Sequence, residues 1–151
     1  MARIKIQIPD KELPKKDPNT GWIVKYEYRF KPIFEIDDIS RKKIFHVELS
    51  SIREFVHFNY DLDYKVTNTN NKIKIEILGL NTNNLNFPST GRAIAKIPFD
   101  GLFGVYEFEI VRQSGESNIF VIDVDPLQNS IKLIEELPDK KTNRKFVEYM
   151  E

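Results

Sequence analysis

The chain has 151 residues, a length that fits a single domain spanning residues 1–151, and its 23 basic residues balance its 23 acidic ones. Balanced charge removes the electrostatic basis for a general binder of nucleic acid or of anionic membranes, so neither is expected as a partner. Cysteine is absent, which excludes disulfides and any cysteine-based zinc site or nucleophile. No signal peptide or bilayer-length apolar run is recognisable, so the cytoplasm is the default expectation for location.

Residues 1–21 are expected to form a first strand followed by an arm. Isoleucine alternates with polar neighbours from Ile4 to Ile8, which is the period of a β-strand, and Pro9 ends the run. Two further prolines and a turn over residues 17–21 then interrupt any regular ladder.

A strongly aromatic strand is predicted from Trp22 to Phe30. Charged residues occupy one side, and the other side consists of Trp22, Val24, Tyr26, Tyr28 and Phe30. Tryptophan and tyrosine also form sugar-binding platforms, but strict alternation against charges favours burial in a core. Pro32 interrupts this strand, and residues 33–36 either continue it after a bulge or begin an edge strand.

Residues 43–66 have the pattern of a β-hairpin. A turn at Ser51-Ile52 would place His46 opposite His57 on the outer face. Two imidazoles on adjacent strands, with carboxylates nearby, have the chemistry to hold zinc or copper. Such a pair also arises easily by chance and no third ligand is uniquely placed, so no metal site is assigned.

Isoleucine alternates with charged residues over Lys72–Ile77, which predicts another strand. The Asn-rich segment that follows, residues 81–90, contains Leu85 and Phe87. It is either a functional loop or, as its two apolar residues favour, a plug over an open end of the fold.

The stretch from Gly91 to Asp125 predicts a three-stranded meander. Asp100-Gly101 suits a two-residue hairpin turn that places Ile97 opposite Gly104, and a second turn follows at residues 114–117. The residues expected on the buried side are Ala93, Ala95, Ile97, Tyr106, Phe108, Ile110, Phe120, Ile122 and Val124.

The other side of this meander is half apolar and is the predicted contact surface. Its apolar residues are Ile94, Phe103, Val105, Val111, Ile119 and Val121, and the last five of these are the predicted contact residues. A sheet side that faced only water would carry fewer apolar residues, so part of it is expected to be covered by the C-terminal segment, a loop or another subunit. Lys96, Glu107 and Glu109 would frame a contact with a protein partner or a second copy.

After Pro126, the pattern predicts a short strand over residues 131–137 and a C-terminal helix over residues 139–151. Phe146, Val147 and Met150 recur at helical spacing, and Pro138 with Asp139 suits the start of a helix.

Two stretches carry a resemblance to known modules. Leu13-Pro14 is followed by the alternating strand Ile23–Arg29, and Gly104-x-Tyr106-x-Phe108-x-Ile110 forms a late strand. These segments, about twenty residues together, resemble fibronectin-III-like and immunoglobulin-like modules, including small ones of phage virion proteins. The resemblance implies a β-sandwich.

No motif for catalysis is present. No serine lies in a Gly-x-Ser-x-Gly elbow, and no phosphate-binding glycine loop occurs among the six glycines, so neither an enzyme nor a cofactor is expected. The acidic pairs Asp37-Asp38, Asp61-x-Asp63 and Asp123-x-Asp125 have the chemistry of a calcium site, although solvated strand ends explain them more simply.

Together, these patterns predict a mainly β protein, an antiparallel immunoglobulin-like sandwich of about eight or nine strands with a short C-terminal helix. The predicted function is a non-enzymatic binding or assembly module, for example a structural component of a virion-like or surface assembly. The alternative is a carbohydrate-recognition module, with calcium as an optional aid.

Overall fold

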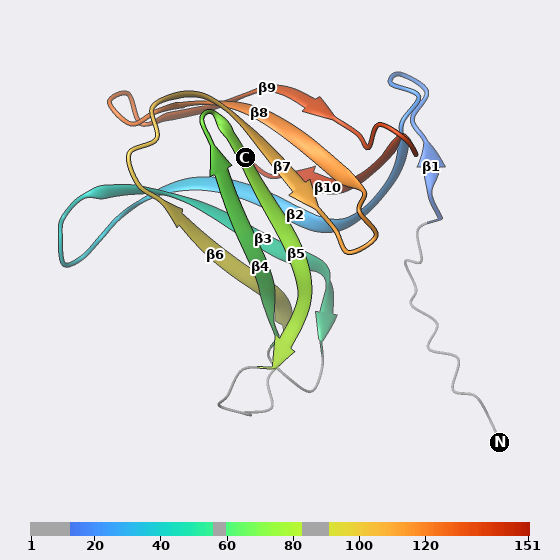
Figure 1. Cartoon of the computed structure of the whole chain (residues 1–151), viewed down its shortest axis with the longest axis horizontal. Coiled ribbons are helices and arrows are strands. Elements are labelled where there is room, and N and C mark those ends of the chain that lie inside the picture. Colours follow the sequence, from blue (N-terminus) through green and yellow to red (C-terminus); the bar gives the residue numbers. More distant parts are fainter. Residues whose placement is uncertain (1–12, 56–59, 83–90) are drawn as a thin grey trace.

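The computed structural model describes residues 13–55, 60–82 and 91–151, which form one mixed β-sheet (Figure 1). The strands are β1 (Lys15–Lys16), β2 (Ile23–Ile36), β3 (Lys43–Phe55), β4 (Tyr60–Thr69), β5 (Lys72–Thr82), β6 (Gly91–Phe99), β7 (Gly104–Val111), β8 (Ser117–Asp125), β9 (Ser130–Leu137) and β10 (Arg144–Tyr149). Their order is β1-β2-β3-β6-β4-β5-β7-β8-β9, and β10 pairs with β2. The described residues contain no helix that is long and apolar enough to cross a membrane.

The expected antiparallel sandwich is therefore wrong. One sheet curls on itself into a half-barrel, and three of its pairings are parallel: β10 with β2, β4 with β6, and β5 with β7. Alternating apolar residues predict a sheet with one buried face. Because a curled sheet buries its concave face much as two stacked sheets bury their facing sides, the residue pattern does not separate the two architectures.

The long strands β2 and β3 form the base of the half-barrel. β2 continues through Pro32 to Ile36 before the chain turns into β3. β3 pairs with β2 on one side and with β6 on the other, and β4 lies beyond β6. The hairpin predicted over residues 43–66 is therefore wrong.

The first half of the predicted meander is wrong and the second half is right. β6 lies between β3 and β4, so the Asp100-Gly101 bend carries the chain to another part of the sheet. β7 and β8 form the expected antiparallel pair, with Phe108 opposite Phe120. An Asp-Gly turn favours a hairpin locally, but the neighbour of a strand is decided by the register that buries its apolar side.

The C-terminal helix predicted over residues 139–151 is also wrong. Residues 140–142 form a turn, and Arg144–Tyr149 is strand β10, parallel to β2. A bulge between Lys145 and Val147 lets consecutive residues be buried. In the sequence, neighbouring apolar residues such as Phe146 and Val147 lack the alternation of a strand and match the apolar face of a short helix.

Phenylalanines from five strands form the centre of the core: Phe30, Phe45, Phe99, Phe108 and Phe120. Phe30 stacks on Phe120 with ring centroids 4.9 Å apart, and Phe108 lies 5.6 Å from Phe30. The buried side predicted for residues 91–125 is confirmed, except that Tyr106 is half-buried. The sequence therefore identified which side of β6, β7 and β8 packs inward.

Three expectations concern residues outside the described ranges: the first strand over residues 4–8, the position of His57, and the Asn-rich segment 83–90. Within the predicted arm, the short strand β1 pairs with the start of β2. The predicted turn at residues 17–21 is confirmed, since the Gly21 N–H donates to the Asp17 carbonyl at 2.8 Å.

Candidate functional site

Strands β9 and β10 are two free edges of the curled sheet that face each other, and the space between them is called the seam. Within the described residues, β9 pairs only with β8 and β10 pairs only with β2. The two strands run in opposite directions (Figure 1), and Lys145 of β10 pairs with Glu136 of β9. Residues 138–143 connect them at the closed end of the seam, and the other end opens into a groove.

At the closed end, a buried asparagine takes the place of a neighbouring strand. Asn118, fully buried on β8, accepts hydrogen bonds through Oδ1 from the backbone N–H groups of Phe146 at 2.8 Å and Val147 at 3.0 Å. Its Nδ2 donates to the Arg144 carbonyl at 2.9 Å. Because a side-chain amide offers the same donor and acceptor as a peptide group, one residue completes this part of the β10 edge.

A buried ion pair lies beside this asparagine. Lys145 is 1% exposed, and its Nζ lies 3.1 Å from Oε1 of Glu136 on β9 and donates to the Val147 carbonyl at 2.6 Å. The same Nζ lies 4.1 Å from the centroid of the Phe120 ring. Burial lowers the pKa of Lys145, and Glu136 opposes that shift. The pair ties β10 to β9 across the seam.

Asp139 fixes the turn between β9 and β10. Its Oδ1 accepts from the Ser117 N–H at 3.0 Å, and its Oδ2 accepts from the N–H groups of Lys141 at 3.1 Å and Thr142 at 2.9 Å. Burial raises the pKa of Asp139, but these hydrogen bonds outweigh burial and the pKa is lowered overall. The carboxylate therefore holds the turn against β8.

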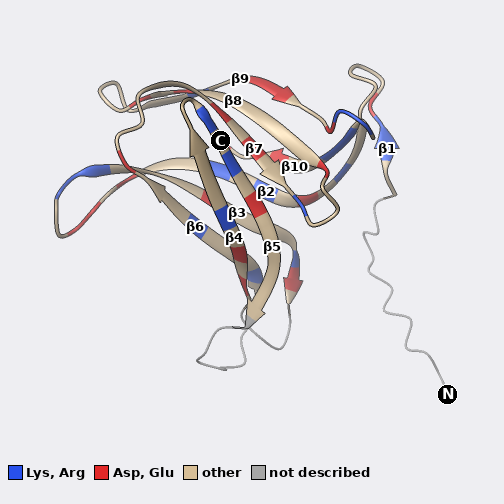
Figure 2. Ribbon diagram, viewed as in Figure 1, with Lys and Arg blue, Asp and Glu red and all other residues tan. Residues whose placement is uncertain are grey.

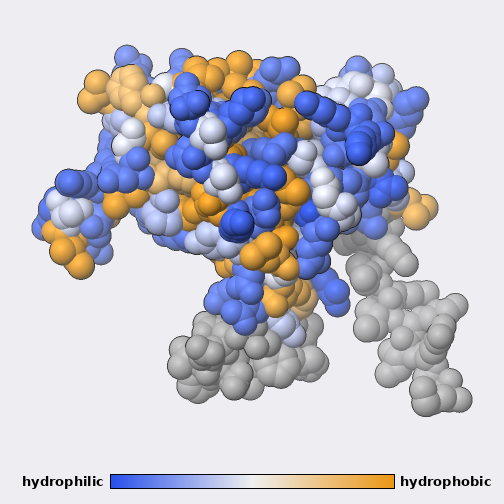
Figure 3. Space-filling model, viewed as in Figure 1, coloured by the Kyte–Doolittle hydropathy of each residue, from blue (hydrophilic) through white to orange (hydrophobic). Residues whose placement is uncertain are grey.

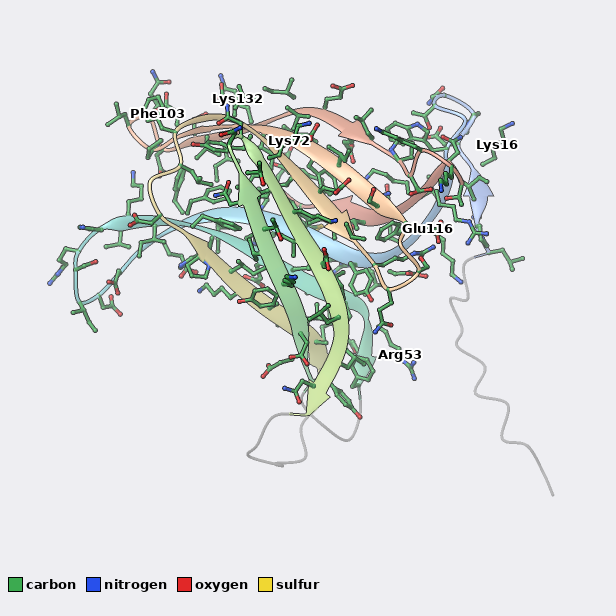
Figure 4. All side chains as sticks on the ribbon, in the orientation of Figure 1. Lys16, Arg53, Lys72, Phe103, Glu116 and Lys132 are labelled. Atoms are coloured by element: carbon green, nitrogen blue, oxygen red, sulfur yellow. The ribbon has the colours of Figure 1, made fainter. Side chains whose placement is uncertain are left out.

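At the open end, the seam widens into a groove with a volume of about 840 Å³. It is lined by Pro32, Ile33, Phe34, Asn129, Ile131, Lys132, Leu133, Tyr149 and Glu151. Figure 4 shows Lys132 at the upper margin of the molecule, whereas Glu116, whose carboxylate contacts the closed-end turn at Thr142, lies far to the right. The groove and the closed end are thus separate regions.

Unpaired strand edges flank the groove. β10 ends at Tyr149, opposite Phe30, whereas β2 runs on to Ile36. Beyond Phe30, the β10 side of β2 has no strand partner in the described part of the chain, and neither has the outer edge of β9. Such edges present backbone groups that another chain can use, although Pro32 on the β2 edge has no N–H to donate.

The groove is lined by both apolar and polar groups. Burial raises the pKa of Tyr149 to about 12, so its hydroxyl stays protonated at neutral pH. Within the described ranges, this hydroxyl makes no hydrogen bond, and neither Lys132 nor Glu151 forms an ion pair. An apolar site with a few unoccupied polar groups suits a ligand that carries both kinds of group.

The contact surface predicted from the sequence lies elsewhere, on the convex face of β7 and β8. Phe103 is 58% exposed and Val105 is 47% exposed, whereas Ile119 is only 8% exposed and therefore buried. Val111 and Val121 are half-buried. Figure 2 shows charged residues along the neighbouring strand β5, and Figure 3 shows hydrophilic residues between apolar ones on the visible face.

The predicted histidine pair does not follow from the observed register. His46 lies opposite Ile33 of β2 and Pro98 of β6, and His57 is outside the described residues. Nδ1 of His46 lies 3.3 Å from Oε2 of Glu35, and burial lowers the pKa of His46. Among the described residues, no group of three or more histidines and carboxylates is arranged to hold a metal.

Two of the candidate calcium-binding carboxylates are engaged in turns. Asp37 accepts a hydrogen bond from Oγ of Ser40 at 2.6 Å, and Asp125 accepts one from the Leu127 N–H at 3.1 Å. The aromatic residues of the sugar-binding alternative are half-buried, namely Trp22, Tyr26 and Tyr28. Carbohydrate recognition stays an untested prediction.

Sequence reasoning missed the whole seam. Asn118 stands directly before an apolar run, and Lys145 directly precedes Phe146 and Val147. A polar residue beside buried positions is a signal that it has a specific partner. The partner itself is not readable from the sequence, and the groove has no local signal because it lies between strands from different parts of the chain.

No family model, no curated protein and no solved structure matches this chain. The resemblance to immunoglobulin-like and fibronectin-III-like modules therefore stays untested, and nothing found indicates an enzyme. The geometry of the seam remains as the basis for assigning a function.

Proposed function

We propose that the chain is a non-enzymatic protein-binding module whose open seam takes up an extended segment of a partner protein. The observation that carries this proposal is the combination of two strand edges that are unpaired within the described residues with a partly apolar groove between them. A segment inserted there would extend the sheet and fill the gap that the half-barrel leaves. A module that completes its sheet with another chain has a role in assembly.

Backbone chemistry favours an extended peptide over a compact ligand. A peptide strand pairs with the N–H and C=O groups of a free edge, and its side chains alternate between two faces. One face would then lie against Ile131 and Leu133, which line the groove and pack on the core. Each Å² of apolar surface buried in this way contributes about 25 cal/mol.

The polar groups of the groove add selectivity. The protonated Tyr149 hydroxyl is able to donate to a carbonyl of the bound segment, and Lys132 attracts a carboxylate. Glu151, which also lines the groove, attracts a basic side chain, so a preferred segment alternates apolar residues with polar or charged ones.

Peptide binding combined with hydrogen exchange tests this proposal. Short fluorescent peptides that alternate apolar and polar residues are titrated against the full chain, and anisotropy reports binding. Hydrogen exchange then shows which amides become protected. We expect bound peptides to slow exchange along β9 and to leave the hairpin of β4 and β5 unchanged, because only the seam gains backbone partners.

Two isoleucines on β9 supply a matched pair of variants. Ile131 lines the groove, whereas Ile134 is 56% exposed and lies outside the lining, at the bulge in the pairing with β8. Ile131→Trp places a bulky ring in the groove, where it obstructs a bound segment, and is expected to weaken peptide binding about tenfold or more. Ile134→Trp should bind as the wild type does. Equal binding by both variants, or a peptide set without a single binder, would refute the seam as the binding site.

Self-association through the convex face is the second candidate, because Phe103 and Val105 are exposed there. Copies that meet through this face would bury both side chains without using the seam. Sedimentation velocity of Phe103→Ser distinguishes the two surfaces. Association that is lost in Phe103→Ser and kept in Ile131→Trp would favour the convex face.

A further inference from the structure

The sequence that precedes the described residues has the pattern that the groove calls for. In residues 3–8, isoleucine alternates with arginine, lysine and glutamine. A strand with one apolar and one polar side becomes stable when a sheet or a packed core covers its apolar side. The described chain begins at Leu13, whose side chain is 73% exposed.

Within one copy, the segment and the groove lie at opposite edges of β2. β1 and β10 both pair with Ile23 and Val24, so they occupy opposite edges of β2. From Tyr28 onward, β3 takes the edge that β1 occupies. The groove, beside Pro32, is on the β10 edge. The chain that enters β1 would have to cross the sheet to reach its own groove, whereas the groove of a second copy is open to it.

Length and charge also fit the groove of a second copy. Twelve residues precede Leu13 and reach at most about 40 Å, whereas a strand with the eight residues of β9 spans about 26 Å. Glu151, which lines the groove, forms no ion pair within the described residues. Its carboxylate is a suitable partner for Arg3 or Lys5 of the segment.

We propose that residues 3–8 of one copy insert as a strand into the open seam of a second copy, so that copies join head to tail. This inference rests on the proposed function and names the partner as another copy of the chain. Each joint places isoleucines of one copy against Ile131 and Leu133 of the next. Because the arm and the groove are different surfaces, the contact is heterologous and produces open chains or rings.

Two full-length variants test the arm, residues 3–8, and the groove separately. Ile6→Asp puts a charge on the apolar side of the arm and leaves the groove intact, whereas Ile131→Trp obstructs the groove and leaves the arm intact. Gln7→Asp adds the same charge to the polar side and serves as the matched control. Sedimentation velocity is recorded for the wild type, for each variant and for an equimolar mixture of Ile6→Asp with Ile131→Trp.

The wild type and Gln7→Asp should form oligomers that grow with concentration. Ile6→Asp and Ile131→Trp should each associate about tenfold more weakly or not at all. Their mixture should give a one-to-one heterodimer, because the intact arm of Ile131→Trp fits the intact groove of Ile6→Asp and no further copy is able to add.

A wild-type chain that stays monomeric, or a mixture that does not associate, overturns the inference. If the wild type is monomeric while short peptides still protect β9, only the inference fails. If peptides also fail to bind, the proposed function fails with it. Association that survives both Ile6→Asp and Ile131→Trp but is lost in Phe103→Ser would place the contact on the convex face and would equally overturn the inference.

Discussion

The closed and open ends of the seam differ in what lies beside the free strand edges. At both ends, the curled sheet leaves a strand edge without a neighbouring strand. At the closed end, side chains take the neighbour's place: Asn118 bonds three backbone groups of β10, and Lys145 pairs with Glu136. At the open end, no side chain of the described residues fills that place, and an apolar groove remains.

This difference separates residues that maintain the fold from residues available for binding. Buried polar groups at the closed end depend on their partners, so removing one leaves the other unsatisfied. Polar groups of the open end contribute less to stability because fewer of them are engaged. Variants of the closed end should therefore change unfolding, and variants of the open end should change binding.

The largest effect is expected for Asn118→Leu. Leucine leaves the backbone N–H groups of Phe146 and Val147 without acceptors, and each unsatisfied buried group costs about 1–3 kcal/mol. We expect the free energy of unfolding, measured by urea denaturation, to fall by about 3 kcal/mol or more. Asn71→Leu, at an exposed turn, is the control and should change it by less than about 0.5 kcal/mol. Similar losses in both variants would contradict the role of Asn118.

Asp139→Asn should have the next largest effect, about 2 kcal/mol at neutral pH. Because the pKa of Asp139 is lowered in the folded state, its contribution is complete above the unfolded pKa of about 3.9 and is lost as pH falls through the folded pKa. The stability difference between wild type and variant should therefore shrink in acid. Urea denaturation across this range measures it, with Asp38→Asn at an exposed position as the control. A difference that is constant with pH would contradict the assignment.

The seam ion pair should respond differently to two substitutions. Glu136→Gln leaves the buried Lys145 charge poorly compensated and should cost about 1 kcal/mol, a modest value because Glu136 is partly exposed. Lys145→Met replaces the charge with an apolar side chain of similar length and should change stability by less than about 1 kcal/mol. Thermal unfolding of both variants tests this order. A larger loss in Lys145→Met would show that the charge itself holds the seam.

The smallest effect on stability, below about 0.5 kcal/mol, is expected for Tyr149→Phe, because the hydroxyl makes no hydrogen bond within the described residues. Peptide affinity should nevertheless fall about threefold if the hydroxyl donates to the bound segment. Anisotropy titration measures that change. Tyr106→Phe is the control, since its hydroxyl accepts from the Phe103 N–H instead of lining the groove. Unchanged affinity in Tyr149→Phe would remove this hydroxyl from the binding model.

Local features of the fold were predictable from residue order. The β7 and β8 hairpin follows from a short turn and two alternating runs, and its register pairs Phe108 with Phe120 as that pattern requires. The C-terminal strand was not predictable in this way. Its bulge buries consecutive residues from Lys145 to Val147, which removes the period-two signal that identifies a strand.

The predicted contact surface shows the same division. Alternation correctly placed Val105 and Val121 on the side opposite the core, and Phe103 is exposed. It did not predict that Ile119 is buried on that side or that a groove forms elsewhere. The groove depends on the meeting of β9 with the β2 and β10 edge, which lie far apart in the sequence.

Apart from β10, the sequence by itself determined where the main strands form and which of their sides are apolar, because steric preferences and alternation act between near neighbours. The tertiary structure alone decided that one sheet curls into a half-barrel, that β10 joins β2, and that Asn118 completes an edge while the groove stays open. Those outcomes depend on long-range pairing, in which each strand takes the neighbour that buries the most apolar surface and satisfies the most backbone groups.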